Sequence, residues 1–503
     1  MSTSITFKGC DEAEWFSKEL QHSFQGVLSK NYISDRQDSL FGSVTASVDG
    51  RPWSDTIWSR DAGTFLRELV HYGCFEEAKG VLQSLLKHID VNESGYLTFP
   101  DWVKLGERKS GDELDGTTMI IIASVLLSER LPECDPFHDT IYDFLVSAAS
   151  PVRYILHTLQ RSPFIAGSGE FGGGCEIEGS FYNVVQNGMS VLTLDMVGTR
   201  LKGDTPEALM LKQRCLAASR ELNLRMADCF VGEAGQWHWS LNTSTCLPDY
   251  DNNIMEINRG FGGINGVLSH AADVHGFLPR ALNEPWLAPS VQTFWKLLSH
   301  PKRMEQFVKY GMWTQFDDFR FGLSTGPSYG HGYALQIMLL LDRPELYTKA
   351  ANWLAWATLN PGYSLEREND YWFFERYYSP ELHGRHDLEE GCGALNLVNV
   401  TEPLKIARLM VGVDDSSLQP VRIVPRLPAG WTEAAVTNMP IRGADGNRTL
   451  NLLIRADKQG AVTDIQGSSA SPLPELLIRL GSAERPRWRT IGEGSLSFQA
   501  HSE

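Results

Sequence analysis

The sequence predicts a mainly α-helical protein, an (α/α)6 toroid over residues 1–415, followed by a small antiparallel β domain, sandwich-like, over 416–503. Three observations predict this fold class. Apolar residues recur every three or four positions as far as about Val411. The links between the helical segments alternate between short and long. After Asp415 the helical pattern gives way to extended segments that are interrupted by proline.

The apolar periodicity predicts twelve helices, because each segment places its hydrophobic residues on one stripe. A further piece at 303–313 belongs either to a separate helix or to a loop. The expected helices, in chain order, are 11–28, 60–72, 75–89, 115–130, 137–159, 182–198, 205–229, 259–275, 286–299, 328–342, 345–359 and 393–411.

Every second link is short, beginning with the turn around Gly73 between the second and third helices and ending with Arg343 and Pro344 between the tenth and eleventh. The other links are long and rich in Gly, Trp, Asp and Glu. Short links join antiparallel neighbours. If these hairpins close into a ring, all short links lie on one rim and all long links on the other, which becomes a concave functional face.

The C-terminal part is predicted to be a sheet of short strands. Residues 421–431 are extended and punctuated by proline, and strands are expected at 450–454, 462–465 and 476–480 between Gly, Asp and Ser turns.

The composition of the chain excludes some classes of function. The chain has 503 residues, 42% hydrophobic and 21% charged, which is enough for a sizeable core. A formal net charge of −17 argues against nucleic acid or an anionic membrane surface as the main partner. The sequence has neither a signal-peptide pattern nor an apolar run of membrane-spanning length, so a cytoplasmic location is expected. The eight scattered cysteines indicate reduced thiols.

Carboxylates and aromatic residues recur in the long links, just before helices. For each single carboxylate, a structural role as a helix cap or in an ion pair is at least as consistent with the sequence as a catalytic role. Together on one rim they favour glycoside hydrolysis by inversion, which needs an acid and a base on opposite sides of the scissile bond. The candidates are Trp58, Arg60, Asp61, Asp115, Glu176, Glu178, Tyr182, Trp237, Trp239, His331, Trp372, Glu375, Glu389 and Glu390.

Three of these motifs resemble, in order, those of the glucoamylase-like six-hairpin glycosidases, a group that includes rhamnosidase-type members. They are Trp58-Ser-Arg60-Asp61, Asp115-Gly116, and the segment from Glu176 through Gly179-Ser-Phe181-Tyr182 to Gln186. The segment 423–431 resembles the C-terminal β domain of rhamnosidase-type members. The resemblance covers about the first 415 residues and implies the same toroid and a hydrolytic activity.

The resemblance also implies roles for single residues. Glu176 would be the general acid, with Glu178 as its rival, and Glu389 the base, with Glu390 and Glu375 as rivals. Arg60 and Asp61 would bind the terminal sugar. The sequence departs from the family pattern at Cys175, where a Trp is usual before the acidic pair.

The expected function is therefore an exo-acting glycosidase that cleaves an α-linked oligosaccharide or glycoside with inversion, without cofactor or metal. Two alternatives remain open. The same scaffold can serve an isomerase, a lyase or a cyclase acting on a small metabolite, or it can bind sugar without catalysis, because fold does not fix function.

Overall fold

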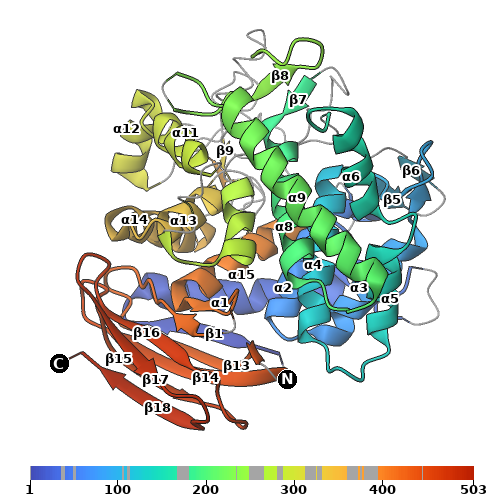
Figure 1. Cartoon of the computed structure of the whole chain (residues 1–503). Coiled ribbons are helices and arrows are strands. Elements are labelled where there is room, and N and C mark those ends of the chain that lie inside the picture. The colour runs from blue at the N-terminus through green and yellow to red at the C-terminus, as the bar shows by residue number, and fades with distance from the viewer. Residues whose placement is uncertain are drawn as a thin grey trace.

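The computed structural model describes residues 2–35, 40–48, 53–104, 107–109, 114–166, 181–233, 235–248, 266–279, 282, 287–311, 324–325, 331–359, 372–373, 377–378, 395–417, 419–443 and 446–502. In this part of the chain a large helical assembly lies against one curled β-sheet, and both chain termini lie on the side of the sheet (Figure 1). No helix in these ranges is long and apolar enough to span a membrane.

Among the described residues, six helical segments form an inner ring whose residues are nearly all buried. Their side chains meet other protein on every side, and in α2 and α15 the buried residues include charged ones. They are α2 (Ser59–His71), α4 (Leu114–Arg130), α8 (Val184–Arg200), the helical residues 266–275, α13 (His331–Leu340) and α15 (Leu397–Val411).

Contacts between neighbours close this ring. α2 packs on α4, α4 on α8, α13 on α15, and α15 returns to α2. The helical residues 266–275 join α8 through a hydrogen bond of 2.8 Å from Arg200 Nη1 to the Asp273 carbonyl. They join α13 through the hydrogen bond between Ser269 and Gln336. The predicted (α/α)6 toroid is confirmed.

The outer helices alternate with the inner ones along the chain, as the alternating links predicted. They are α1 (Asp11–Gly26), continued by the π-helical turn Val27–Asn31, then α3 (Phe75–Lys87), α5 (Phe137–Val146) with α6 (Pro151–Arg161), α9 (Pro206–Cys229), α11 (Ala288–Leu298) with α12 (Pro301–Tyr310), and α14 (Pro344–Leu359).

Two helix predictions need correction, and a third is resolved. The single helix expected at 137–159 is α5 plus α6, because Ser150 caps a new helix by accepting from Val152 N–H at 3.1 Å and Pro151 has no N–H to continue the first one. The helix expected at 182–198 begins at Val184, after a short strand that ends at the cap Asn183. The extra piece at 303–313 is α12. Residues 259–265 of another expected helix lie outside the described residues.

Short strands in the long links pair with one another, so these links lie on the same rim. β2 (Thr56–Trp58) pairs with β5 (Trp102–Lys104), which pairs with β6 (Glu107–Lys109). β7 (Phe181–Asn183) pairs with β8 (Ser240–Asn242), and β9 (Ser324–Thr325) with β10 (Tyr377–Tyr378). One further hairpin joins β3 (Asp90–Val91) to β4 (Leu97–Thr98).

The large sheet has the order β1-β13-β14-β15-β16-β12-β11, with β17 beside β16 and β18 beside β15. Its strands are β1 (Ser4–Lys8), β11 (Val413–Asp414), β12 (Val421–Ile423), β13 (Glu433–Gly443), β14 (Gly446–Ala456), β15 (Val462–Ser468), β16 (Leu476–Gly481), β17 (Pro486–Ile491) and β18 (Ser497–His501). The three predicted strands lie within β14, β15 and β16.

The sheet differs from the expected one in two ways. It is mixed, because β12 runs parallel to β16. It also recruits β1, which pairs antiparallel with β13, and β11. Trp431 is fully buried where the sheet meets the ring: its indole lies 5.3 Å from the ring of Phe7 and 5.6 Å from that of Phe16, and its N–H donates to Asn352 at 2.9 Å.

Candidate functional site

Arg60, Asp61 and Asp115 form a buried ionic cluster at the N-terminal ends of two adjacent inner helices. Arg60 Nε lies 3.5 Å from Asp61 Oδ1, and Arg60 Nη1 lies 3.7 Å from Asp115 Oδ2. Asp115 also accepts a hydrogen bond of 2.7 Å from the Gly116 N–H. Carboxylates are favoured at a helix N-terminus by the helix dipole. The structure therefore brings together three of the predicted site residues; that they bind sugar stays a prediction.

Two glycines make this cluster possible, because they let α2 and α4 approach closely. A Cβ on Gly116 would lie 2.9 Å from the backbone N of Arg60, and one on Gly63 would lie 3.0 Å from Ile120. The Asp115-Gly116 element thus has a packing function beside any role in binding.

Tyr333, on the first turn of α13, connects this cluster with the interior of the ring. Its side chain is buried, and burial raises the pKa of its phenol well above the usual value. The charges of Glu402 and Asp61 raise this pKa further, and those of Arg67 and Arg60 lower it, each by less than burial does. The hydroxyl therefore stays protonated at neutral pH. Tyr333 was not among the candidate site residues, although it lies two residues after His331; its place on the first turn of an inner helix was the available signal.

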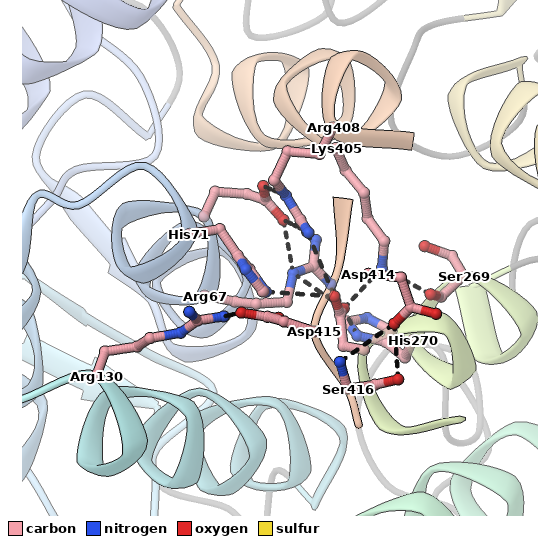
Figure 2. A network of polar contacts seen from close by, with 12 residues as sticks. Arg67, His71, Arg130, Ser269, His270, Lys405, Arg408, Asp414, Asp415 and Ser416 are labelled. Atoms are coloured by element: carbon pink, nitrogen blue, oxygen red, sulfur yellow. Dashed lines mark hydrogen bonds and ion pairs between the residues drawn. The ribbon is translucent and has the colours of Figure 1, made fainter. Parts of the chain in front are cut away.

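Charged side chains from three inner helices meet in a buried network (Figure 2). Arg408 of α15 forms a bidentate pair with Glu68 of α2, with both N–O distances 2.8 Å. Asp273 accepts from Lys405 Nζ at 2.8 Å and lies 3.6 Å from Arg67 Nε. Burial opposes ionisation of Glu68, but Arg408 and Arg67 outweigh it and lower the pKa of this carboxyl to about 2.

Glu402 of α15 is the carboxyl of this network that holds a proton most readily. It is fully buried, accepts a hydrogen bond from the Gln336 amide, and its Oε1 lies 3.9 Å from Arg67 Nη2. Burial raises the pKa of Glu402 more strongly than Arg67 and Lys405 lower it. Burial also lowers the pKa of its neighbour Lys405. This network was not predicted from the sequence; its signal was charged residues at helix positions that the apolar pattern places toward the interior.

Tyr182, Trp237 and Trp239 lie at the β7–β8 pair and are buried. The Tyr182 hydroxyl lies 2.8 Å from Ser162 Oγ, and its ring lies 5.4 Å from that of Phe164. The backbone N–H of Trp237 donates to Thr293 Oγ1 at 2.8 Å. The Trp239 carbonyl accepts from Val184 N–H at 3.0 Å. These contacts hold the links to the ring; a binding role for the three residues remains a prediction.

His331 and Trp372 contact the outer helices. His331 Nε2 lies 3.0 Å from the Ala350 carbonyl of α14, and burial lowers the pKa of this imidazole to about 4, so it is neutral at pH 7. The ring of Trp372 lies 3.8 Å from that of His22 on α1, and Trp372 also packs against Gly26. Neither contact tests the predicted binding of sugar.

Trp58 precedes the ionic cluster directly and lies half-buried at the end of β2. The catalytic candidates Glu176, Glu178, Glu389 and Glu390, and the candidate Glu375, lie outside the described residues. Among the residues that are described, no group of His, Cys, Asp and Glu side chains could hold a metal ion.

No protein-family model matches the sequence, and no curated protein is similar to it. Solved structures are similar in fold. An α-L-rhamnosidase of Streptomyces avermitilis, complexed with L-rhamnose, superposes with a TM-score of 0.58 at 10% identity, over 99% of this chain and 42% of that one. A putative kojibiose phosphorylase from the human microbiome gives a TM-score of 0.53 at 11% identity, over 100% and 60%.

The chain has the fold of the six-hairpin glycosidases. An α-amylase from Clostridium perfringens is a further structural neighbour, with a TM-score of 0.46 at 13% identity, over 78% of this chain and 97% of that one. The chain spans less than two thirds of the length of the rhamnosidase and of the phosphorylase.

Proposed function

We propose that this protein is a glycoside hydrolase that removes the terminal sugar of an α-linked oligosaccharide or glycoside with inversion at the anomeric carbon. One observation carries the proposal: the buried cluster of Arg60, Asp61 and Asp115 lies at the rim to which the long links belong, in a fold shared with carbohydrate-active enzymes. Buried carboxylates whose charge is balanced by arginine are suited to accept hydrogen bonds from sugar hydroxyls.

In the proposed reaction Glu176 protonates the glycosidic oxygen as the bond to the anomeric carbon breaks. Glu389 takes a proton from a water molecule, whose oxygen bonds to the opposite face of the same carbon. The products are an inverted free sugar and the leaving alcohol, and no cofactor is consumed. Inversion requires room for water between the two carboxyl groups, about 6.5–9.5 Å.

The test is release of sugar from a panel of aryl α-glycosides, including rhamnosides and glucosides, with the product anomer identified by NMR in the first minutes. We expect the β-anomer first from an α-glucoside. Glu176→Gln should lower kcat by about 100- to 10,000-fold, because the amide cannot protonate the leaving group, while the affinity for the intact substrate is retained. Glu178→Gln is the matched control.

Two outcomes would contradict the proposal. Initial release of the α-anomer would exclude inversion, and absence of turnover for every glycoside would exclude hydrolysis. The assay is run with and without inorganic phosphate, since one structural neighbour is a putative phosphorylase. Hydrolysis is independent of phosphate, so a strict requirement for it would assign phosphorolysis instead.

A further inference from the structure

An open cavity lies where three outer helices meet. α5, α6 and α9 contact one another there (Figure 1). The β3–β4 hairpin lies beside them, because the Leu97 N–H donates to the Ala149 carbonyl at 2.7 Å. The cavity has a volume of about 610 Å³, which is within the range of small-molecule sites. None of the described residues that line it is a predicted site residue.

Three half-buried basic side chains line this cavity: Arg153, His157 and Arg214. Arg153 Nε donates to the Ser147 carbonyl at 3.0 Å and Nη2 to the Val146 carbonyl at 3.1 Å, which holds the guanidinium group in place. Arg214 forms no hydrogen bond or ion pair with another residue of the described ranges. The Nε2 atom of His157 is buried and likewise has no hydrogen-bond partner there. Buried polar groups normally have a partner, so this pattern indicates a ligand.

The two guanidinium groups are close enough to act on the same buried thiol. Burial raises the pKa of the Cys215 thiol to about 12, and the charges of Arg214 and Arg153 lower it by less. Two positive charges in one cavity repel each other unless an anion neutralises them. A phosphate dianion matches such a pair, because each guanidinium group keeps its charge and can donate two parallel hydrogen bonds to phosphate oxygens.

The rest of the lining suits the body of a sugar. Asp143 and Glu207 are exposed at the cavity, and neither forms an ion pair within the part of the chain that is described. Carboxylates accept hydrogen bonds from hydroxyl groups, but they repel a bare anion. Tyr96 and Tyr142 add aromatic faces, and the Tyr96 ring lies 5.2 Å from the imidazole of His157. The cavity should therefore prefer a phosphate that carries hydroxyl groups over inorganic phosphate.

We propose that this cavity binds a phosphorylated sugar. The phosphate group contacts Arg214, Arg153 and His157, and the sugar hydroxyls contact Asp143 and Glu207. The inference does not rest on glycoside hydrolysis, because the cavity shares no residue with the ionic cluster.

The test is isothermal titration of the unaltered protein with glucose-6-phosphate, inorganic phosphate, glucuronate and glucose at neutral pH and low ionic strength. We expect glucose-6-phosphate to bind more tightly than the other three. Arg214→Gln should weaken its binding about tenfold or more, the effect of losing a charged hydrogen bond. Arg220→Gln, at an exposed position of α9 outside the cavity, is the matched control and should leave the affinity unchanged.

Two further variants separate the parts of the cavity. Tyr96→Ala should weaken binding of glucose-6-phosphate and leave that of inorganic phosphate unchanged, because only the sugar ring contacts the tyrosine. His157→Gln should weaken binding of both. It also replaces Arg214→Gln in the comparison if that variant has a lower melting temperature than the unaltered protein.

Three results would overturn the proposal: no binding of glucose-6-phosphate, binding that is unaffected by Arg214→Gln and His157→Gln, or equal affinity for glucuronate. Phosphate that binds at the rim, as phosphorolysis would require, is insensitive to Arg214→Gln, so the titrations distinguish the two sites. Release of sugar from aryl glycosides, measured without added phosphate, should be the same for Arg214→Gln and the unaltered protein. Failure of the cavity and failure of the proposed function are therefore separate results.

Discussion

At the scale of the residue, His331 shows how burial sets a charge state. Its imidazole lies between α13 and α14, against Trp353 and the Ala350 carbonyl, and burial lowers its pKa to about 4. The unfolded chain, in which histidine titrates near 6.5, therefore binds a proton at a higher pH than the folded chain does. The contribution of His331 to stability is complete above about pH 6.5 and is lost as the pH falls towards 4.

This linkage gives a pH-dependent prediction for His331→Gln. The difference in the free energy of unfolding between the unaltered protein and this variant should shrink by about 3 kcal/mol between pH 7.5 and pH 4. Urea titrations at several pH values measure it. His300→Gln, at an exposed position before α12, is the control and should show a nearly constant difference. A constant difference for His331→Gln as well would mean that folding does not change the pKa of this imidazole.

At the scale of the element, the crossing of α2 over α4 determines the geometry of the ionic cluster. Alanine normally replaces a helical glycine with a gain in stability, because glycine loses more backbone entropy on folding. Gly116 is different, because the added Cβ would meet the backbone of Arg60 and Ser59, which cannot move without separating the two helices.

Gly116→Ala should therefore destabilise the protein by about 1–3 kcal/mol, against the sign of the helix propensity. It should also weaken sugar binding, because Arg60 and Asp115 move apart. Thermal unfolding and titration with the substrate measure the two effects. Gly492→Ala, where no atom lies within 4 Å of the added Cβ, is the control and should change stability by less than about 0.5 kcal/mol. A stabilised Gly116→Ala variant would contradict the close packing.

Also at this scale, local sequence patterns predicted where helices occur but not where a helical segment is interrupted. The apolar periodicity predicted the helices and the alternating links predicted the ring, because these patterns follow from burial and chain connectivity. The break before Pro151 was missed, since the apolar periodicity continues across it. The charged residues of α15 at 402, 405 and 408 recur every third position, a pattern that also describes an exposed helix face. Only the partners of these residues, on α2 and in the helical residues 266–275, show that they belong to a buried network and not to an exposed helix face.

At the scale of the whole molecule, the N-terminal strand makes the sheet and the ring one structure. Phe7 on β1 is buried, contacts Trp431 and Phe16, and pairs with Ala434 of β13. The sequence could not predict this pairing, because its partners lie more than 400 residues apart. Nor could it place the predicted site residues relative to one another: Arg60, Asp61 and Asp115 meet, whereas Tyr182, His331 and Trp372 contact other elements.

Phe7→Ala should lower the free energy of unfolding by about 4 kcal/mol and speed amide hydrogen exchange in β13. Lys8→Ala is the matched control on the exposed face of β1, where the Lys8–Glu433 ion pair of 3.1 Å contributes at most about 1 kcal/mol. Exchange in β13 that is unaffected by Phe7→Ala would mean that residues 416–503 fold independently of the N-terminus.

The Arg408–Glu68 pair has a consequence for biosynthesis. The two residues are 340 positions apart, and at about 5–20 residues per second the ribosome needs roughly 20–70 s to make the intervening chain. During that time the nascent inner helices expose apolar faces and Glu68 lacks Arg408. Closure of the toroid is therefore a late event in the life of each new chain, and the emerging polypeptide is a natural client for chaperones that shield apolar surface.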